Sequence, residues 1–114
     1  MLYIGVDLGT SAVKLLMMDE NGNIQKIVSK EYPLYFPYPG WSEQNPQDWF
    51  AQSMEGIKEL TSECDKSQVA GISFGGQMHG LVVLDKEDQV IRPAILWNDG
   101  RTTKETNYLN QVIG

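Results

Sequence analysis

An acid, a glycine and two hydroxyl residues follow the first apolar segment, residues 2–6, in the run Asp7, Leu8, Gly9, Thr10 and Ser11. The flexible glycine and the short hydroxyl side chains allow backbone N–H groups and hydroxyls to converge on a phosphate. The Asp7 carboxylate can hold Mg²⁺ through water, because magnesium takes oxygen ligands and keeps several of its waters. The pattern predicts a phosphate site without a Walker sequence. The alternative is a hairpin turn with a solvated Asp7.

A single histidine lies among glycines after another apolar segment, residues 69–74. The run that contains it is Gly75, Gly76, Gln77, Met78, His79 and Gly80. Because glycine has no side chain, a ligand can approach the backbone closely there. Two interpretations stay open, since an imidazole at the exit of a strand can bind a ligand or serve as a structural donor in a turn.

Amide, carboxylate and guanidinium groups meet at a third polar corner, residues 98–101, after an extended segment that Pro93 interrupts. Asn98, Asp99 and Arg101 can each form hydrogen bonds with the hydroxyls of a sugar. The alternative is a capped turn in which Asp99 and Arg101 pair on the surface, an interaction worth about 0–1 kcal/mol.

The run from Asp7 to Ser11 resembles the phosphate-binding hairpin of the superfamily that contains actin, the sugar kinases and the chaperone ATPases. The resemblance implies an α/β, ribonuclease-H-like (actin/hexokinase/chaperone-ATPase) fold that uses ATP and Mg²⁺. It implies that Asp7 handles the metal and that Lys14 assists. It also implies that the residues contacting the nucleotide phosphates are Gly9, Thr10 and Ser11.

The other two runs resemble those of the xylulokinases, a branch of the FGGY carbohydrate kinase family. The pair Met78-His79 matches their sugar-contacting turn, where glycerol kinases carry Arg-Glu instead. Residues 92–101 and 40–44 are also typical of them. The resemblance implies that D-xylulose is the sugar. The residues it implies for sugar binding are Gln77, Met78, His79, Asn98, Asp99 and Arg101.

The same resemblance implies that residues 1–114 form an incomplete N-terminal part of the first FGGY kinase domain, with a mixed sheet and packed helices. The catalytic base would be an aspartate beyond Gly114, so no catalytic residue is assigned here and no useful turnover is expected of this chain alone. Two rival interpretations remain. One is a kinase for gluconate, ribulose, fuculose or glycerol, and the other is a non-catalytic actin-like binding module.

The elements that must position these residues begin with three strands, residues 2–6, 12–18 and 24–32, which predict an antiparallel meander. Asn21-Gly22 favours a two-residue turn between the last two, because both central positions of that turn need a positive φ. The segment 69–74 is predicted to be a buried strand and 81–84 a further strand. An extended stretch, residues 90–97, follows them.

Residues 32–41, with three prolines and five aromatic residues, predict an extended loop. Its rings either form a binding platform or pin the loop to the core. Asn45 and Pro46 predict the start of a helix. A second helix is predicted after Thr102 or Thr103. The apolar positions of the two helices are Trp49, Phe50, Ile57 and Leu60, with Met54 at the margin, and Tyr108, Leu109, Val112 and Ile113.

Composition excludes several classes of protein. The formal charge of -6 arises from 15 acidic and 9 basic residues, and the scattered bases leave no patch for nucleic acid or anionic lipid. One cysteine, Cys64, excludes an internal disulfide and, with one histidine, a zinc-ligand set. We expect a cytoplasmic protein, with no leader or membrane span in this sequence. The expected partners are a small sugar and MgATP, and a homodimer stays open.

Overall fold

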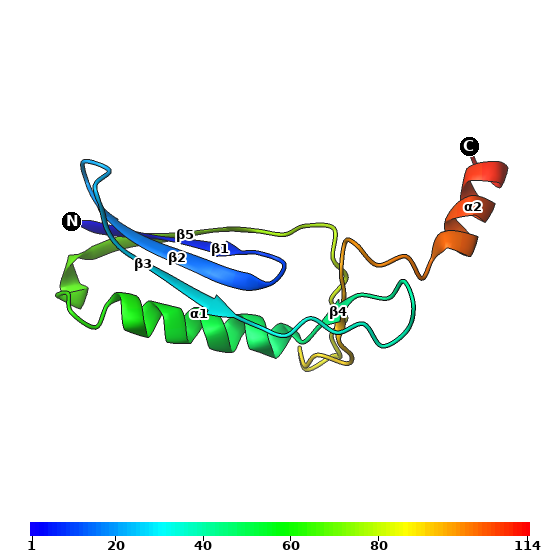
Figure 1. Ribbon diagram of the computed structural model, residues 1–114, viewed down its shortest axis with the longest axis horizontal. Coiled ribbons are helices and arrows are strands. Elements are labelled where there is room, and N and C mark those ends of the chain that lie inside the picture. The colour runs from blue at the N-terminus through cyan, green and yellow to red at the C-terminus, as the bar shows by residue number, and fades with distance from the viewer. The chain divides into compact units, whose positions relative to one another are not determined.

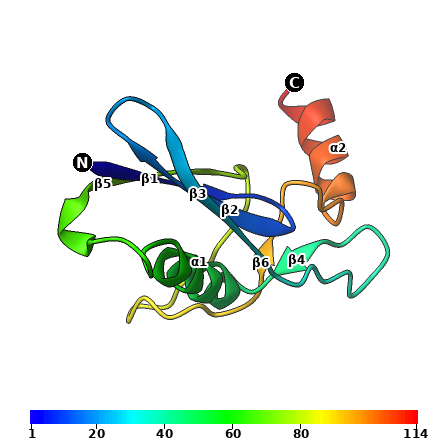
Figure 2. The same cartoon turned by 60° about the vertical axis from the view of Figure 1, so that its left-hand side comes forward.

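A computed structural model describes all residues from 1 to 114, and the chain divides into two compact units (Figures 1 and 2). The first unit comprises Met1–Pro33 and Pro46–Met78. The second comprises Leu34–Asn45 and His79–Gly114.

A mixed four-stranded sheet forms the first unit, in the order β3-β2-β1-β5. The strands are β1 (Leu2–Leu8), β2 (Ala12–Asp19), β3 (Ile24–Glu31) and β5 (Val69–Gly76). Strands β1, β2 and β3 are antiparallel neighbours, whereas β5 runs parallel to β1. The predicted meander and the mixed sheet are therefore confirmed.

The turn between β2 and β3 differs from the prediction. The Gly22 N–H donates to the Asp19 carbonyl and the Asp19 N–H donates to the Asn23 carbonyl, so three residues form the loop. Gly22 has a φ of 83°, but Asn21 does not have a positive φ. The prediction of a two-residue turn was wrong, because a type I turn followed by a left-handed glycine also fits this sequence.

Helix α1 (Pro46–Leu60) packs on β2 and β3 and closes the core of the first unit. It begins at Pro46, as predicted. Leu60 is buried and Trp49 and Ile57 pack partly buried against the core, but Phe50 is 68% exposed, so its assignment to the apolar face was wrong. The residues that complete the face are the small ones, Ser53 and Gly56, because the helix lies too close to the sheet for larger side chains.

Strand β5 is less buried than its apolar sequence predicted. Ile72 and Phe74 are 45% and 62% exposed. They align with the buried Ile4 and Val6 of β1. Because α1 covers β2 and β3 while β5 forms one edge of the sheet, these two side chains lie beyond the helix. A short 3₁₀ helix, η1 (Lys66–Gln68), leads into β5.

The second unit contains little regular structure. Strands β4 (Glu43–Gln44) and β6 (Ala94–Ile95) pair antiparallel. The strand predicted over residues 81–84 is reduced to isolated bridges, Leu81 with Ile95 and Leu84 with Val90. The extended segment that was predicted to follow it is present, but only β6 is a regular strand within it.

Helix α2 (Thr103–Val112) occupies the end of the chain, as predicted. Thr102 is its N-cap residue, although its side chain makes no capping hydrogen bond. All four residues of the predicted apolar stripe are exposed, so α2 is not a packed helix within this chain. Neither helix is long and apolar enough to cross a membrane.

The proline-rich loop before β4 carries exposed rings. Tyr35, Phe36 and Tyr38 are 47%, 64% and 61% exposed. Only Tyr32, at the start of the loop, is buried in the core. These three rings therefore do not pin the loop, whereas Tyr32 is held in the core of the first unit and the half-buried Trp41 stacks on Arg101.

Candidate functional site: the carboxyl ends of β1 and β5

Asp7 lies near the end of β1 on the sheet face that α1 leaves uncovered. Its neighbours along the strand, Val6 and Leu8, point toward the core side because successive side chains alternate between faces. Asp7 is exposed and lies opposite Lys14 of β2 and Gly75 of β5. These residues, with Ser73, line an open hollow of about 380 Å³. The sheet register thus brings the predicted metal residue and the predicted lysine together.

The turn after Asp7 is held by hydrogen bonds on its core side. The Gly9 N–H donates to the Ala12 carbonyl at 2.9 Å, which closes the hairpin. A Cβ at position 9 would lie 2.9 Å from that carbonyl oxygen, so the tight turn requires glycine. Tyr32 donates from its hydroxyl to the Gly9 carbonyl and from its backbone N–H to the Ser11 carbonyl. The sequence predicted the turn but not the role of Tyr32.

The second glycine-rich run begins at the carboxyl end of β5, beside the carboxyl end of β1. Leu8 and Gly76 are parallel partners, and the Gln77 N–H donates to the Leu8 carbonyl at 2.7 Å. A Cβ at Gly76 would lie 2.7 Å from that carbonyl oxygen, so this glycine allows the two strands to end side by side. Gln77 and the exposed Met78 therefore leave the sheet next to the Gly9 turn.

His79 begins the second unit in a left-handed conformation, with a φ of 64°. A non-glycine residue in this region carries backbone strain, which is frequent at functional sites. The imidazole is exposed. Asp88, in a turn of the same unit, has nearly the same φ of 62°, so this conformation alone does not mark a binding residue.

The third polar corner holds an ionic cluster instead of free ligand groups. The Asp99 carboxylate accepts hydrogen bonds from the Arg101 side chain at 2.7 and 2.9 Å and from the Ser42 N–H at 2.6 Å. The Arg101 donors hold the pKa of Asp99 well below its usual range. The side chains of Asp99 and Arg101 are only 2% and 11% exposed, so the pair is buried and not on the surface.

Glu43 of β4 completes this cluster. Its carboxylate, 9% exposed, accepts from Arg92 at 2.7 Å and from Arg101 at 2.8 Å. The Arg101 guanidinium also lies 3.7 Å from the centre of the Trp41 ring. The cluster fastens residues 41–43 to the polar corner, and this geometry shows a structural use of two side chains for which sugar binding was also predicted.

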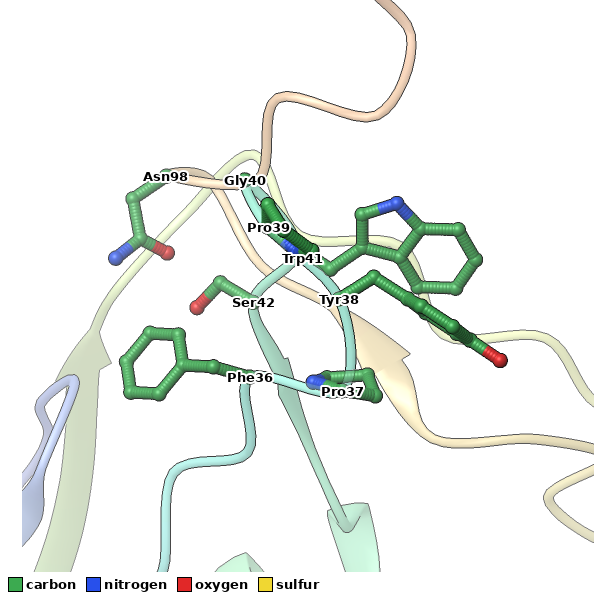
Figure 3. A pocket seen from close by; sticks show the side chains of 8 residues that line it. All are labelled: Phe36, Pro37, Tyr38, Pro39, Gly40, Trp41, Ser42 and Asn98. Carbon is green, nitrogen blue, oxygen red and sulfur yellow. The ribbon is translucent and has the colours of Figure 1, made fainter.

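Asn98 lies outside the cluster, at the rim of an open hollow of about 410 Å³ in the second unit. Figure 3 shows the side chains of Phe36, Ser42 and Asn98 on one side of the loop and the rings of Tyr38 and Trp41 on the other. No charged residue lines this hollow. Asn98 is exposed and accessible to a ligand.

The chain contains no group of three or more histidine, cysteine, aspartate or glutamate side chains that could hold a metal ion by themselves. Asp7 is therefore a lone carboxylate at its hollow. One carboxylate fits Mg²⁺, which commonly takes one or two protein ligands and completes its shell with water and substrate phosphates. It does not fit a metal that needs a full set of protein ligands.

Sequence reasoning missed Tyr32 and Glu43. The sequence places Tyr32 at the end of the predicted strand 24–32 and Glu43 within the run 40–44 that is typical of xylulokinases, and neither position indicates a role in the site. No sequence signal marked Glu43 as buried either, because its neighbours Ser42, Gln44 and Asn45 are all polar. No signal identified Tyr32, because its bonds depend on the distance between two turns in space.

Comparison with known proteins identifies relatives over the whole chain. Residues 2–114 match the N-terminal domain of the FGGY family of carbohydrate kinases. The chain is 49% identical to a xylulose kinase of Bacillus subtilis, over 97% of this chain and 23% of that protein. It is 40% identical to a xylulose kinase of Escherichia coli, over 98% of this chain and 23% of that protein.

Solved structures agree with the sequence relatives. A xylulose kinase from Lactobacillus acidophilus superposes with a TM-score of 0.92 at 34% identity, over 96% of this chain and 22% of that one. A structure described as a xyloylose kinase from Brucella ovis gives a TM-score of 0.91 at 43% identity, over 97% and 24%. The predicted ribonuclease-H-like fold is confirmed, and the chain belongs to the FGGY family of carbohydrate kinases, matching the N-terminal domain of its members.

Proposed function

We propose that the full-length protein containing this chain transfers the γ-phosphoryl group of MgATP to D-xylulose and forms D-xylulose 5-phosphate. Relatives named xylulose kinase at 40–49% identity support this substrate. This chain spans 23% of their length, so the proposal concerns the longer polypeptide. We also propose that it acts in the cytoplasm.

The observation that carries the proposal is the in-register parallel pairing of β1 with β5. Asp7 pairs with Gly75, and the Gln77 N–H bonds to the Leu8 carbonyl. A phosphoryl transfer needs the phosphate donor and the acceptor hydroxyl in line and close together. The two candidate binding turns meet this need, because they follow the adjacent carboxyl ends of β1 and β5.

The proposed roles follow from the chemistry of each group. Gly9, Thr10 and Ser11 bind the phosphates, Lys14 adds positive charge, and Asp7 holds magnesium. When bound, magnesium would neutralise charge that develops on the transferring phosphoryl group. The general base that takes the sugar proton is expected beyond Gly114, so this chain alone should not turn over substrate.

The sugar-binding roles are proposed for Gln77, Met78, His79 and Asn98, whose polar groups can bond sugar hydroxyls or, for Met78, pack against carbon atoms. Asp99 and Arg101 would contribute by shaping the corner that carries Asn98, since their charges already pair with each other.

A sugar panel tests the function. Purified full-length protein with ATP is expected to phosphorylate D-xylulose at least tenfold faster, by kcat/KM, than gluconate, ribulose, fuculose or glycerol. Asp7→Asn should lower kcat strongly while leaving sugar binding unchanged, and His79→Ala should raise the KM for sugar. Preferred turnover of another sugar, or none with ATP, would refute the proposal.

Gluconate is the second candidate. A gluconokinase of Bacillus subtilis is 32% identical over 87% of this chain. A gluconate kinase structure from Lactobacillus acidophilus superposes with a TM-score of 0.92 at 34% identity. The Met78-His79 pair and the run 98–101 favour xylulose, and the panel above distinguishes the two.

A further inference from the structure

Tyr32 makes two bonds to the candidate phosphate turn from the core side of the sheet. Its hydroxyl donates to the Gly9 carbonyl, and its backbone N–H donates to the Ser11 carbonyl at 3.2 Å. The residue is 5% exposed and belongs to the hydrophobic core of the first unit. One side chain therefore connects that core directly to the turn.

The bond to Gly9 sets the direction of a neighbouring donor. A peptide unit is planar and trans, so its carbonyl and the N–H of the next residue point in opposite directions. With the Gly9 carbonyl held toward Tyr32, the Thr10 N–H is oriented away from the core side. Glycine at position 9 has no Cβ to restrict rotation of this peptide, so the hydroxyl bond supplies the restraint.

We propose that Tyr32 is a positioning residue that holds the Gly9–Thr10 peptide in the orientation needed to bind a nucleotide phosphate. This proposal rests on the proposed function, because it assigns the turn to phosphate. Tyr32 itself touches no substrate. It acts through the turn, and its ring packs in the core independently of that action.

The hydroxyl stays protonated under all ordinary conditions. Burial, with a further contribution from the negative charge of Asp7, raises the pKa of Tyr32 to about 12. A protonated phenol is a donor, and a carbonyl oxygen can only accept. The bond is therefore present throughout the pH range in which a kinase works.

The test compares three variants of the full-length protein. Tyr32→Phe keeps the ring and removes only the hydroxyl. Tyr35→Phe removes a hydroxyl from an exposed ring in the second unit, and Val28→Ala weakens the same core from β3 without touching the turn. The measurements are KM for ATP, KM for sugar, kcat and the free energy of unfolding.

Loss of one hydrogen bond is expected to raise the KM for ATP about tenfold in Tyr32→Phe, with the KM for sugar and kcat changing less than twofold. Tyr35→Phe should match the wild type. Val28→Ala should lose stability and keep its KM for ATP. An unchanged KM for ATP in Tyr32→Phe, or an equal increase in Val28→Ala, would overturn the positioning role.

Amide hydrogen exchange separates this proposal from the proposed function. In Tyr32→Phe without nucleotide, the peptide that spans residues 9–12 should exchange several times faster, while the middle of β1 and β2 stays protected. If the wild type does not bind ATP, the proposed function fails. The exchange rate at residues 9–12 still decides whether Tyr32 restrains the turn. Unchanged exchange at the turn would refute the restraint.

Discussion

Asp19 and Asp85 begin two turns that share one hydrogen-bond pattern. In each, a carboxylate oxygen accepts from the backbone N–H groups two and four residues later, at 2.8–3.0 Å. The fourth position of each turn is left-handed, with φ of 83° at Gly22 and 62° at Asp88. Only Gly22 adopts this conformation without a steric cost.

Replacing Asp88 by glycine is therefore expected to stabilise the chain. Asp88→Gly removes the left-handed strain of a residue with a Cβ, so the free energy of unfolding should rise by about 1 kcal/mol. Gly22→Asp introduces the same strain and should lower it by a similar amount. Urea unfolding of the two variants measures both changes, and a fall in stability for Asp88→Gly would contradict the expectation.

At the level of secondary-structure elements, the close contact between α1 and β2 contributes to stability. A Cβ at Gly56 of α1 would lie 2.4 Å from Cδ1 of Leu15, a fully buried residue of β2. Alanine normally stabilises a helix relative to glycine by about 1 kcal/mol. At this position the preference is outweighed, because the helix would have to move away from the sheet.

Gly56→Ala is expected to lower the free energy of unfolding by about 1–3 kcal/mol. Glu55→Ala, on the exposed side of α1, should change it by less than about 0.5 kcal/mol. Leu15→Val removes the clashing atom, so the Gly56→Ala cost should shrink in the double variant. Denaturant unfolding of the wild type and the four variants checks this. If the effects of Gly56→Ala and Leu15→Val on the free energy of unfolding simply add in the double variant, the clash is excluded.

The ionic cluster makes the second unit sensitive to acid. Because the folded-state pKa of Asp99 is depressed, its contribution to stability is present above its unfolded pKa of about 3.9 and is lost as pH falls below that value. Just below pH 4 the unfolded chain binds a proton at Asp99, whereas the folded carboxylate stays ionised in its bonds to Arg101 and Ser42, so falling pH favours unfolding.

Asp99→Asn should cost about 3 kcal/mol at neutral pH, because it leaves buried Arg101 without its main partner. Between pH 5 and 2.5 the variant should lose less stability than the wild type. Tryptophan fluorescence reports the change, since Trp41 stacks on Arg101. Glu105→Gln, on exposed α2, serves as the control. If the stability of the wild type and of Asp99→Asn falls in parallel as the pH is lowered, Asp99 is not the group that makes the second unit sensitive to acid.

The sheet of the first unit ends in two edge strands, β3 and β5. Strand β5 has β1 on one side only, and its Phe74 is 62% exposed. An open strand edge beside apolar side chains favours pairing with another chain. The 114-residue chain is therefore expected to self-associate through this edge.

Sedimentation velocity over a concentration series tests the expectation. Phe74→Lys should shift the chain toward monomer, since charge on an edge strand opposes pairing. Phe50→Lys, which replaces a phenylalanine of similar exposure on the outside of α1, should leave association unchanged. A monodisperse wild-type monomer, or an equal effect of both variants, would count against the edge.

The limits of sequence reasoning are physical. Strands β1 to β3, the start of α1 and the small-residue turn after Asp7 were predictable because local pattern and turn chemistry decide them. The exposure of Phe50 and of β5 was not, because burial depends on which elements cover them. The sequence predicted sugar-binding roles for Asp99 and Arg101, but it could not predict that Glu43 binds Arg101. Glu43 is far from both residues in the sequence and meets them only in the folded chain.

The sequence by itself determined the family, strands β1, β2, β3 and β5, both α-helices and the glycine turns after β1 and β5, because those depend on neighbours a few positions apart. Tertiary structure alone decided that β5 aligns with β1 in parallel, so that Asp7 and Gln77 leave one edge together. It also decided that Tyr32 reaches Gly9 across 23 positions. Such contacts depend on distances in space that local sequence patterns do not encode.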